Sequence, residues 1–213
     1  MRKWTLGILL LFLAGCAGRG TQGISEISAG QVQPSATDDR QAQQSAPAGA
    51  GFPTSDKEIK VELEDYGPAP ELTNDVWLNT EGPLRLADLR GKVVLLDMWT
   101  FDCINCKHVI PSLRDWYDRY GPEGLVVIGN HYPEFSYEKE LDLLRQAMAQ
   151  LQVNYPVAQD NEGKTWRAYD NRYWPTLYLI DKHGDIRYKH IGEGHYEVTE
   201  AAIQALLAEP YQQ

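Results

Sequence analysis

Apolar residues are spread unevenly along the chain, and their distribution marks two kinds of segment. Residues 17–66 are mainly Gly, Ser, Ala, Gln, Thr and Pro, with few large apolar side chains. Such a segment cannot bury enough surface to offset the entropy lost on ordering, so we expect a flexible low-complexity linker there. Beyond it, short apolar runs alternate with segments whose apolar residues recur every three or four positions, which predicts a folded domain over residues 67–213.

The clearest signal in this domain is the apolar run at 93–98, which follows Gly91 and is interrupted only by Asp97. It predicts a buried strand, and the apolar spacing after it predicts a helix at 103–120. The same rules predict strands at 76–78, 125–129, 155–157, 173–181 and 186–191, and helical segments at 137–151, 163–169 and 198–207. Elements in this order are typical of the α/β class, with a mixed central sheet and helices on both faces.

A signal for export stands at the start of the chain. Residues 1–16 combine a basic beginning, an apolar run and small residues before Cys16, a secretory pattern shorter than the about 20 residues of a spanning helix. Leu13-Ala-Gly-Cys16 resembles the bacterial lipobox, in which the cysteine is lipidated. We therefore expect a lipoprotein signal peptide at 1–16, and an exported, membrane-anchored protein that faces the periplasm or the cell exterior. An uncleaved anchor with an incidental cysteine is the alternative.

Net charge and cysteine count reduce the number of functions that the sequence allows. The 213 residues carry a net charge of −10, which argues against nucleic-acid binding because that requires a basic surface. If the lipid uses Cys16, only Cys103 and Cys106 remain of the three cysteines. A disulfide between these two closes so small a loop that it adds little stability, so a redox role is favoured over a structural one.

Cys103 and Cys106 stand where the expected strand passes into the expected helix. The unpaired N–H groups and the dipole of a helix N-terminus favour an anion, and so lower the pKa of a cysteine thiol placed there. We expect Cys103, nearer the turn, to be the nucleophile, and Cys106, one helical turn later, to be the resolving thiol. Asp102 should raise the pKa of Cys103 and Lys107 should lower it, and the sequence does not decide between them.

Asp97 is a costly residue for an apolar strand. Burying its charge requires a partner or a raised pKa, and this favours a functional role for the carboxylate. A carboxylate that reaches solvent from the end of a strand is the alternative.

Several motifs together resemble a known family. V-V-L-L-D-M-W-T-F-D-C-I-N-C-K resembles the active-site strand and turn of thioredoxins, with Asp97 six residues and Trp99 four residues before the first cysteine. G-L-V-V-I-G-N-H-Y-P-E-F, N-R-Y-W-P-T-L-Y-L-I-D and I-G-E-G-H-Y make residues 70–207 similar to the extracytoplasmic TlpA/ResA branch of the redoxins, and above all to the thioredoxin-like domain of DipZ-type proteins. The resemblance spans roughly two-thirds of the chain.

The resemblance implies a thioredoxin fold with an N-terminal β-hairpin ahead of the core. It implies that Asp97 takes a proton from Cys106, and that Pro175 is a cis-proline facing the two cysteines. The residues expected to border the substrate groove are Trp174, Thr176, Asp102, Lys107 and Glu193. For Glu193 a plain surface turn is the alternative.

The expected function is that of a membrane-tethered thiol–disulfide oxidoreductase. It would reduce protein disulfides, receive electrons from a membrane thiol donor, and need no cofactor or resident metal. A thiol peroxidase of the redoxin group is one alternative. That chemistry requires a Thr and an Arg near the nucleophilic cysteine, and Thr100 is the only close candidate for either. A copper-binding lipoprotein is the other; it would use the two thiols with His108, and His131 or His195, as further ligands.

Overall fold

The computed structural model describes residues 59–212. The expected signal peptide, the expected lipidation site Cys16 and residues 17–58 of the expected linker lie outside the described residues.

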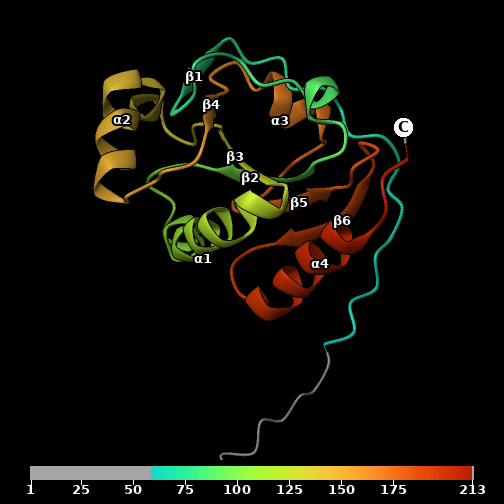
Figure 1. The fold of residues 1–213 in the computed structure, drawn as a ribbon. Coiled ribbons are helices and arrows are strands. Elements are labelled where there is room, and N and C mark those ends of the chain that lie inside the picture. Colours follow the sequence, from blue (N-terminus) through green and yellow to red (C-terminus); the bar gives the residue numbers. More distant parts are fainter. Residues whose placement is uncertain (1–58, 213) are drawn as a thin grey trace, which may run out of the picture. The chain divides into compact units, whose positions relative to one another are not determined.

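A six-stranded mixed sheet forms the centre of the domain (Figure 1), with strand order β1-β4-β3-β2-β5-β6. The strands are β1 (Val76–Leu78), β2 (Val93–Trp99), β3 (Leu125–His131), β4 (Val157–Gln159), β5 (Thr176–Ile180) and β6 (Ile186–Ile191). The helices are α1 (Ile104–Tyr120), α2 (Leu141–Gln150), α3 (Lys164–Ala168) and α4 (Tyr196–Ala208), with 3-10 turns η1 (Leu86–Leu89), η2 (Gly121–Glu123) and η3 (Ser136–Lys139). β2 pairs in parallel with β3 and antiparallel with β5. The predicted α/β class with a mixed sheet is therefore confirmed.

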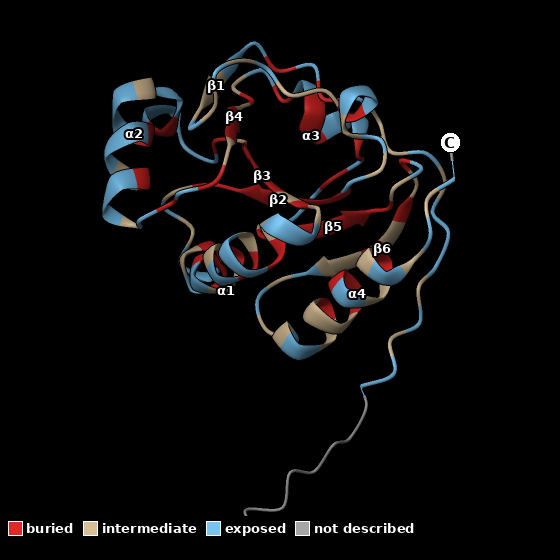
Figure 2. Ribbon diagram, in the orientation of Figure 1, coloured by how far each residue is buried: buried red, intermediate tan, exposed pale blue. Residues whose placement is uncertain are grey.

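Strand β2 is buried along its whole length (Figure 2). Its side chains belong alternately to two separate cores. Leu95 and Trp99 belong to a cluster with residues of α1 and α4, whereas Leu96 belongs to a second cluster with residues of α3. Because successive side chains of a strand point to opposite faces, Asp97 faces the same side as Leu95 and Trp99. The sheet thus has helices on both faces, as predicted, and Asp97 points toward the α1 side.

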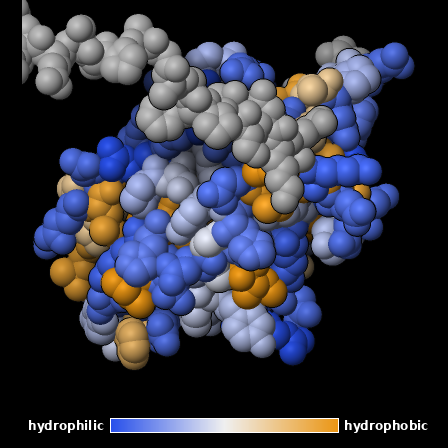
Figure 3. All heavy atoms as spheres, turned by 90° about the horizontal axis from the view of Figure 1, so that it is seen from below, coloured by the Kyte–Doolittle hydropathy of each residue, from blue (hydrophilic) through white to orange (hydrophobic). Residues whose placement is uncertain are grey.

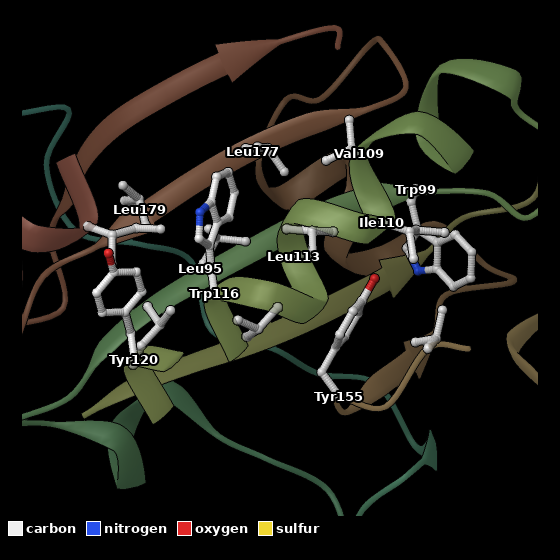
Figure 4. Close-up of a cluster of buried hydrophobic side chains, with 14 of the residues drawn as sticks. Leu95, Trp99, Val109, Ile110, Leu113, Trp116, Tyr120, Tyr155, Leu177 and Leu179 are labelled. Carbon is white, nitrogen blue, oxygen red and sulfur yellow. The ribbon is translucent and has the colours of Figure 1, made fainter. Parts of the chain in front are cut away.

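Helix α1 packs on the sheet through one apolar stripe (Figure 4). The stripe follows the spacing of three and four residues that places side chains on one helix face. Its buried side chains are Cys106, Val109, Ile110, Leu113, Trp116 and Tyr120. Burial of this stripe fixes the axis of α1, and therefore fixes where the two cysteines at its start lie.

The predicted N-terminal β-hairpin is wrong. β1 pairs antiparallel with β4, more than 75 residues later, in the register Val76↔Gln159. The stretch after β1 supplies no partner strand, because Leu86 begins the 3-10 turn η1 and buries its side chain in the second core. The edge of β4 is thus completed by a strand that is distant in sequence and not by a local hairpin.

The last part of the expected linker contacts the domain. The backbone N–H groups of Glu64 and Tyr66 donate to the carbonyls of Arg187 and Ile186 at 2.9 Å. Val61 and Leu63 pack against the core on the α1 side. Residues 64–66 therefore run alongside the start of β6, whereas residues 59–61 lie next to α4.

The uncovered part of the face shown in Figure 3 is mainly hydrophilic, with hydrophobic side chains in separate patches. Over residues 59–212, no helix has both the length and the apolar composition required to cross a membrane.

Candidate active site

Cys103 occupies the N-cap position of α1. Its Sγ accepts a hydrogen bond from the backbone N–H of Cys106 at 3.3 Å, so the sulfur takes the place of the oxygen that usually caps a helix. The Cys106 thiol and the N–H groups of Cys106 and Asn105 lower the pKa of Cys103 to about 6, against the effect of partial burial and of Glu134. The expected effect of the helix N-terminus is thus present in the geometry, and Cys103 is a thiolate at neutral pH.

Cys106 is buried, with 1% of its surface exposed. Burial raises the pKa of the Cys106 thiol well above its usual range, and the hydrogen bond to Cys103 and the charge of Asp97 act in the same direction. No disulfide joins Cys103 and Cys106, so the structure is that of the reduced state. Two neighbouring thiols therefore differ sharply, because one is partly exposed and ionised and the other is buried and protonated.

Asp97 is 1% exposed and lies on the α1 side of the sheet, where the dithiol also lies. Burial raises its pKa well above the ordinary value, and the charge of Cys103 adds to the effect. Among residues 59–212, no donor is within hydrogen-bond distance of its Oδ1 atom. The alternative in which this carboxylate reaches solvent is therefore excluded.

The peptide bond between Trp174 and Pro175 is cis, as the resemblance implies. Pro175 is buried, and its carbonyl accepts from the N–H of Gly192 at 2.9 Å. The ladder pair Met98↔Thr176 sets Pro175 at the end of the sheet from which the chain continues to Cys103. Pro175 thus lies at the same edge as the dithiol.

Trp174 and Thr176 differ in accessibility. Trp174 is partly exposed, and its Nε1 donates to the carbonyl of Tyr132 at 3.1 Å. Its ring stacks on that of Tyr132 and lies tilted against that of Trp166. Thr176 has no exposed surface, and its hydroxyl donates to the carbonyl of Tyr173 at 2.8 Å. The side chain of Thr176 therefore does not border a groove, contrary to the prediction, because it is used to hold the turn before β5.

Asp102 and Lys107 pair with each other. Lys107 Nζ lies 3.0 Å from Asp102 Oδ1, and the hydroxyl of Tyr137 donates to Asp102 Oδ2 at 2.6 Å. Both contacts lower the pKa of Asp102, and the hydrogen bond from Tyr137 has the larger effect. Because the two charges lie together, they offset each other near the dithiol, and the low pKa of Cys103 arises from Cys106 and the helix N-terminus instead.

Glu193 approaches α1 from the loop between β6 and α4. Its carboxylate is paired with Nδ1 of His108, in the first turns of α1. Tyr196, the first residue of α4, donates its hydroxyl to the carbonyl of His108 at 3.3 Å. Glu193 is therefore on the dithiol side of the domain, but its direct contact is with His108.

Glu138, Thr100 and His131 form a buried polar group next to the dithiol that was not predicted from the sequence. All three are fully buried, and the Thr100 hydroxyl contacts both Glu138 Oε1 and His131 Nε2. A Glu in the sequence Ser-Tyr-Glu-Lys gives no sign of burial, because its partners come from other loops. Only the polar Thr100 directly after the apolar strand could have drawn attention to this position.

The side-chain arrangement bears on metal binding. In the described part of the chain, no three His, Cys, Asp or Glu side chains are grouped so that they could hold a metal ion. His108, offered above as a copper ligand, is paired with Glu193, and His131 is buried against Thr100. The residues near the dithiol thus do not form a ready ligand set around it.

Comparisons with known proteins agree with this fold. A family model described as the AhpC/TSA family matches residues 67–189. Protein DipZ of Mycobacterium tuberculosis is 48% identical over 150 residues, which are 69% of this chain and 22% of that protein. The thiol-disulfide oxidoreductase ResA of Bacillus cereus is 31% identical over 137 residues, 64% of this chain and 76% of ResA.

Among solved structures, a putative thiol:disulfide interchange protein DsbE from Chlorobium tepidum has a TM-score of 0.61 and 27% identity, over 69% of this chain and 100% of that one. The chain spans only 22% of the length of the DipZ proteins that it matches. The matched range, residues 67–189, covers more than half of the chain, and Cys103, Cys106 and Pro175 lie within it. Its thioredoxin-like sheet and these matches show that the chain belongs to the AhpC/TSA family, with ResA among its relatives.

Proposed function

We propose that this protein is a thiol–disulfide oxidoreductase that reduces protein disulfides through Cys103 and Cys106. The observation that carries the proposal is the contrast between the two thiols. Cys103 is partly exposed with a pKa of about 6, whereas Cys106 is 1% exposed with a raised pKa. A low-pKa, accessible thiolate next to a second thiol is what disulfide exchange requires.

The reaction begins with attack by the Cys103 thiolate on one sulfur of a substrate disulfide. A bond forms between that sulfur and Sγ of Cys103, the substrate's own S–S bond breaks, and its other sulfur leaves as a thiolate. Cys106 then loses its proton and attacks Sγ of Cys103. This step breaks the mixed disulfide, releases the second substrate sulfur as a thiolate and leaves a disulfide between Cys103 and Cys106, so two electrons pass to the substrate.

Asp97 is the proton acceptor for Cys106 in this scheme. A carboxylate with a raised pKa is a stronger base than an ordinary aspartate, and the charge of Asp97 is felt directly at the Cys106 thiol. Both groups are buried, so a proton can pass between them without first entering bulk solvent. The partly exposed Trp174, which precedes the buried Pro175, forms the wall against which the substrate lies, with Asp102, Lys107 and Glu193 at its border.

The direction of the reaction and the location of the protein complete the proposal. We assign a reducing role with a membrane thiol carrier as electron donor, and attachment to a membrane outside the cytoplasm through lipid at Cys16. A reductant should have a reduction potential of about −270 mV, whereas a value of about −120 mV would make the protein an oxidant. Equilibration of the purified protein with glutathione or dithiothreitol buffers distinguishes the two.

Trapping of the substrate is the test of the function itself. In Cys106→Ser the second step is blocked, so a mixed disulfide with the natural substrate should accumulate on Cys103 when the full chain is produced in its own host. Dithiothreitol should release it. The double variant Cys103→Ser/Cys106→Ser is the matched control, and an identical adduct in that control, or none in the single variant, would contradict the proposal.

The peroxidase alternative finds less support. Its nearby threonine would be Thr100, but the Thr100 hydroxyl is hydrogen-bonded to Glu138 and His131. The charged group that acts on Cys103 is Glu134, an anion, and not an arginine. Peroxide consumption by Cys106→Ser at a rate equal to that of the wild type would favour this alternative over disulfide exchange.

A further inference from the structure

Glu138 is a buried carboxylate outside the mechanism described above. It belongs to the 3-10 turn η3 and has no exposed surface. Its Oε1 accepts from the Thr100 hydroxyl at 2.5 Å and from the N–H of Asp102 at 3.1 Å. Its Oε2 accepts from the N–H groups of Glu134 and Phe135 at 2.7 and 2.8 Å.

These four donors fill the acceptor sites of an ionised carboxylate, two on each oxygen. The donors come from two different loops. Thr100 and Asp102 lie between β2 and α1, immediately before Cys103, whereas Glu134 and Phe135 lie between β3 and η3. Because its carboxylate accepts from donors of both loops, Glu138 joins the two loops into one unit.

The residue next to Glu138 holds the same loop from its outer side. Tyr137 donates its hydroxyl to the carboxylate of Asp102 at 2.6 Å, while Glu138 accepts from the N–H of Asp102. Two consecutive residues of η3 thus contact the backbone and the side chain of the residue that precedes Cys103. Lys107, from α1, adds a contact at 3.0 Å to the Asp102 carboxylate.

Thr100 links this group to His131. A hydroxyl has one proton, and the short contact assigns it to Glu138, so His131 Nε2, 3.3 Å from the Thr100 oxygen, must be the donor in that pair. Burial lowers the pKa of His131 to about 4, although Glu138 acts in the opposite direction. The ring is therefore neutral, with its proton on Nε2, and it stacks on Phe101 with 5.4 Å between the ring centroids.

We propose that Glu138 is a positioning residue for the nucleophile: by fixing the backbone of Thr100–Asp102 from inside, it holds Cys103 at the N-cap of α1. The inference rests on the proposed function. The Sγ atom of Cys103 accepts from Cys106 N–H at 3.3 Å only while the backbone at 102–103 keeps its extended approach to the helix, with Cys103 at φ −70° and ψ 119°. Without the hydrogen bond from the Asp102 N–H to Glu138, the backbone at 102–103 would no longer be held in this conformation.

The test is the pKa of Cys103 in Glu138→Gln, measured as the pH dependence of its alkylation by iodoacetamide in the reduced full-length protein. Glutamine keeps the size of the side chain, but its NH₂ group must face at least one backbone N–H. We expect the midpoint of alkylation to rise by about one pH unit or more, a tenfold change in the ionisation equilibrium. Glu140→Gln, an exposed neighbour without a side-chain cap contact, should leave the midpoint unchanged.

Thr100→Val is a second variant for the same measurement, to be used if Glu138→Gln does not fold. It removes one of the four donors at nearly constant volume, and should raise the midpoint in the same direction but by less. If both folded variants keep the wild-type midpoint while their stability falls, Glu138 is merely structural and the inference is wrong. Alkylation needs no substrate disulfide, so this outcome is separate from a failure of the trapping experiment, which would refute the oxidoreductase function.

Discussion

Asp97→Asn should change the pH dependence of stability in the direction expected for a carboxyl whose pKa is raised by burial. An aspartate in an unfolded chain has a pKa of about 3.9, whereas burial raises the pKa of Asp97 in the folded protein. Between these two values the folded state holds a proton that the unfolded state has released. Stability is therefore lost as pH rises through this window, by about 1.4 kcal/mol per pH unit.

Asparagine cannot titrate, so the variant lacks this loss. The free energy of unfolding of Asp97→Asn minus that of wild type should increase by about 1.4 kcal/mol per pH unit, from about pH 4 up to the pKa of Asp97 in the folded protein. Two other groups give slopes of the opposite sign, since the folded-state pKa is lowered to about 4 for His131 and to about 6 for Cys103. The contribution of His131 is the same in both proteins and cancels in the difference. Both proteins are compared in a Cys103→Ser background, because the charge of Cys103 acts on Asp97 and its contribution would not cancel.

Urea unfolding of the reduced proteins, followed by tryptophan fluorescence at pH 4.5, 5.5 and 6.5, measures this difference. The Asn amide has a burial cost of its own, but that cost does not depend on pH, so the slope is the diagnostic quantity. Asp88→Asn, at an exposed position in η1, is the matched control and should give a flat difference. A flat difference for Asp97→Asn as well would refute the argument that Asp97 is sealed from solvent.

Three further outcomes follow from the same core and site. Asp97→Asn should slow the release of a small mixed disulfide from Cys103 by about 100-fold, as expected for loss of a general base, while stopped-flow shows an unchanged first attack. Tyr155→Phe should raise the free energy of unfolding by up to about 1–3 kcal/mol, because within residues 59–212 its buried hydroxyl has no partner; a loss of stability in urea titration would contradict this. Leu113→Ala should cost about 2–5 kcal/mol, since this fully buried side chain joins α1 to the sheet, whereas Leu143→Ala, at an exposed position, should cost far less in the same titration.

Local patterns in the sequence predicted most of the central elements. The apolar run and its helical continuation correspond to β2 (Val93–Trp99) and α1 (Ile104–Tyr120), because burial on both faces of a strand and on one face of a helix leaves a direct mark on residue order. The pairing of distant segments leaves no such mark. The strand at Val76–Leu78 was therefore recognised, but its antiparallel partner β4 was not, and a hairpin was predicted in its place.

In the active site, too, local features were predicted and contacts between distant segments were not. Cys103, Cys106 and Asp97 were predicted because a thiol pair and a carboxylate are unusual in their immediate surroundings. Thr176 was misjudged, since only the folded turn shows that its hydroxyl is used internally. Glu138 was missed because its four hydrogen bonds arise from two loops that the fold brings together, and no single stretch of sequence contains them.

The start of helix α2 also differs from its prediction for a physical reason. The helical pattern was extended back to Tyr137, but Ser136–Lys139 forms the 3-10 turn η3 and Glu140 is extended, with φ −72° and ψ 116°. The inward turn of Glu138 toward the dithiol loop separates η3 from α2, which begins at Leu141. A requirement of the site thus interrupts a pattern that is locally helical.

The pH profile of disulfide exchange with a small aromatic disulfide decides whether Cys103 is the activated nucleophile. In Cys106→Ser, the serine hydroxyl can donate to Cys103 in place of the thiol and the N-terminus of α1 is unchanged, so the rate of attack should be half-maximal near pH 6, following the pKa of Cys103. In Cys103→Ser, the buried Cys106 should react far more slowly across the same range. A half-maximal rate near about pH 8.5, the value of a free cysteine, or equal reactivity of the two variants, would contradict the assignment of Cys103 as the low-pKa thiolate at the start of α1.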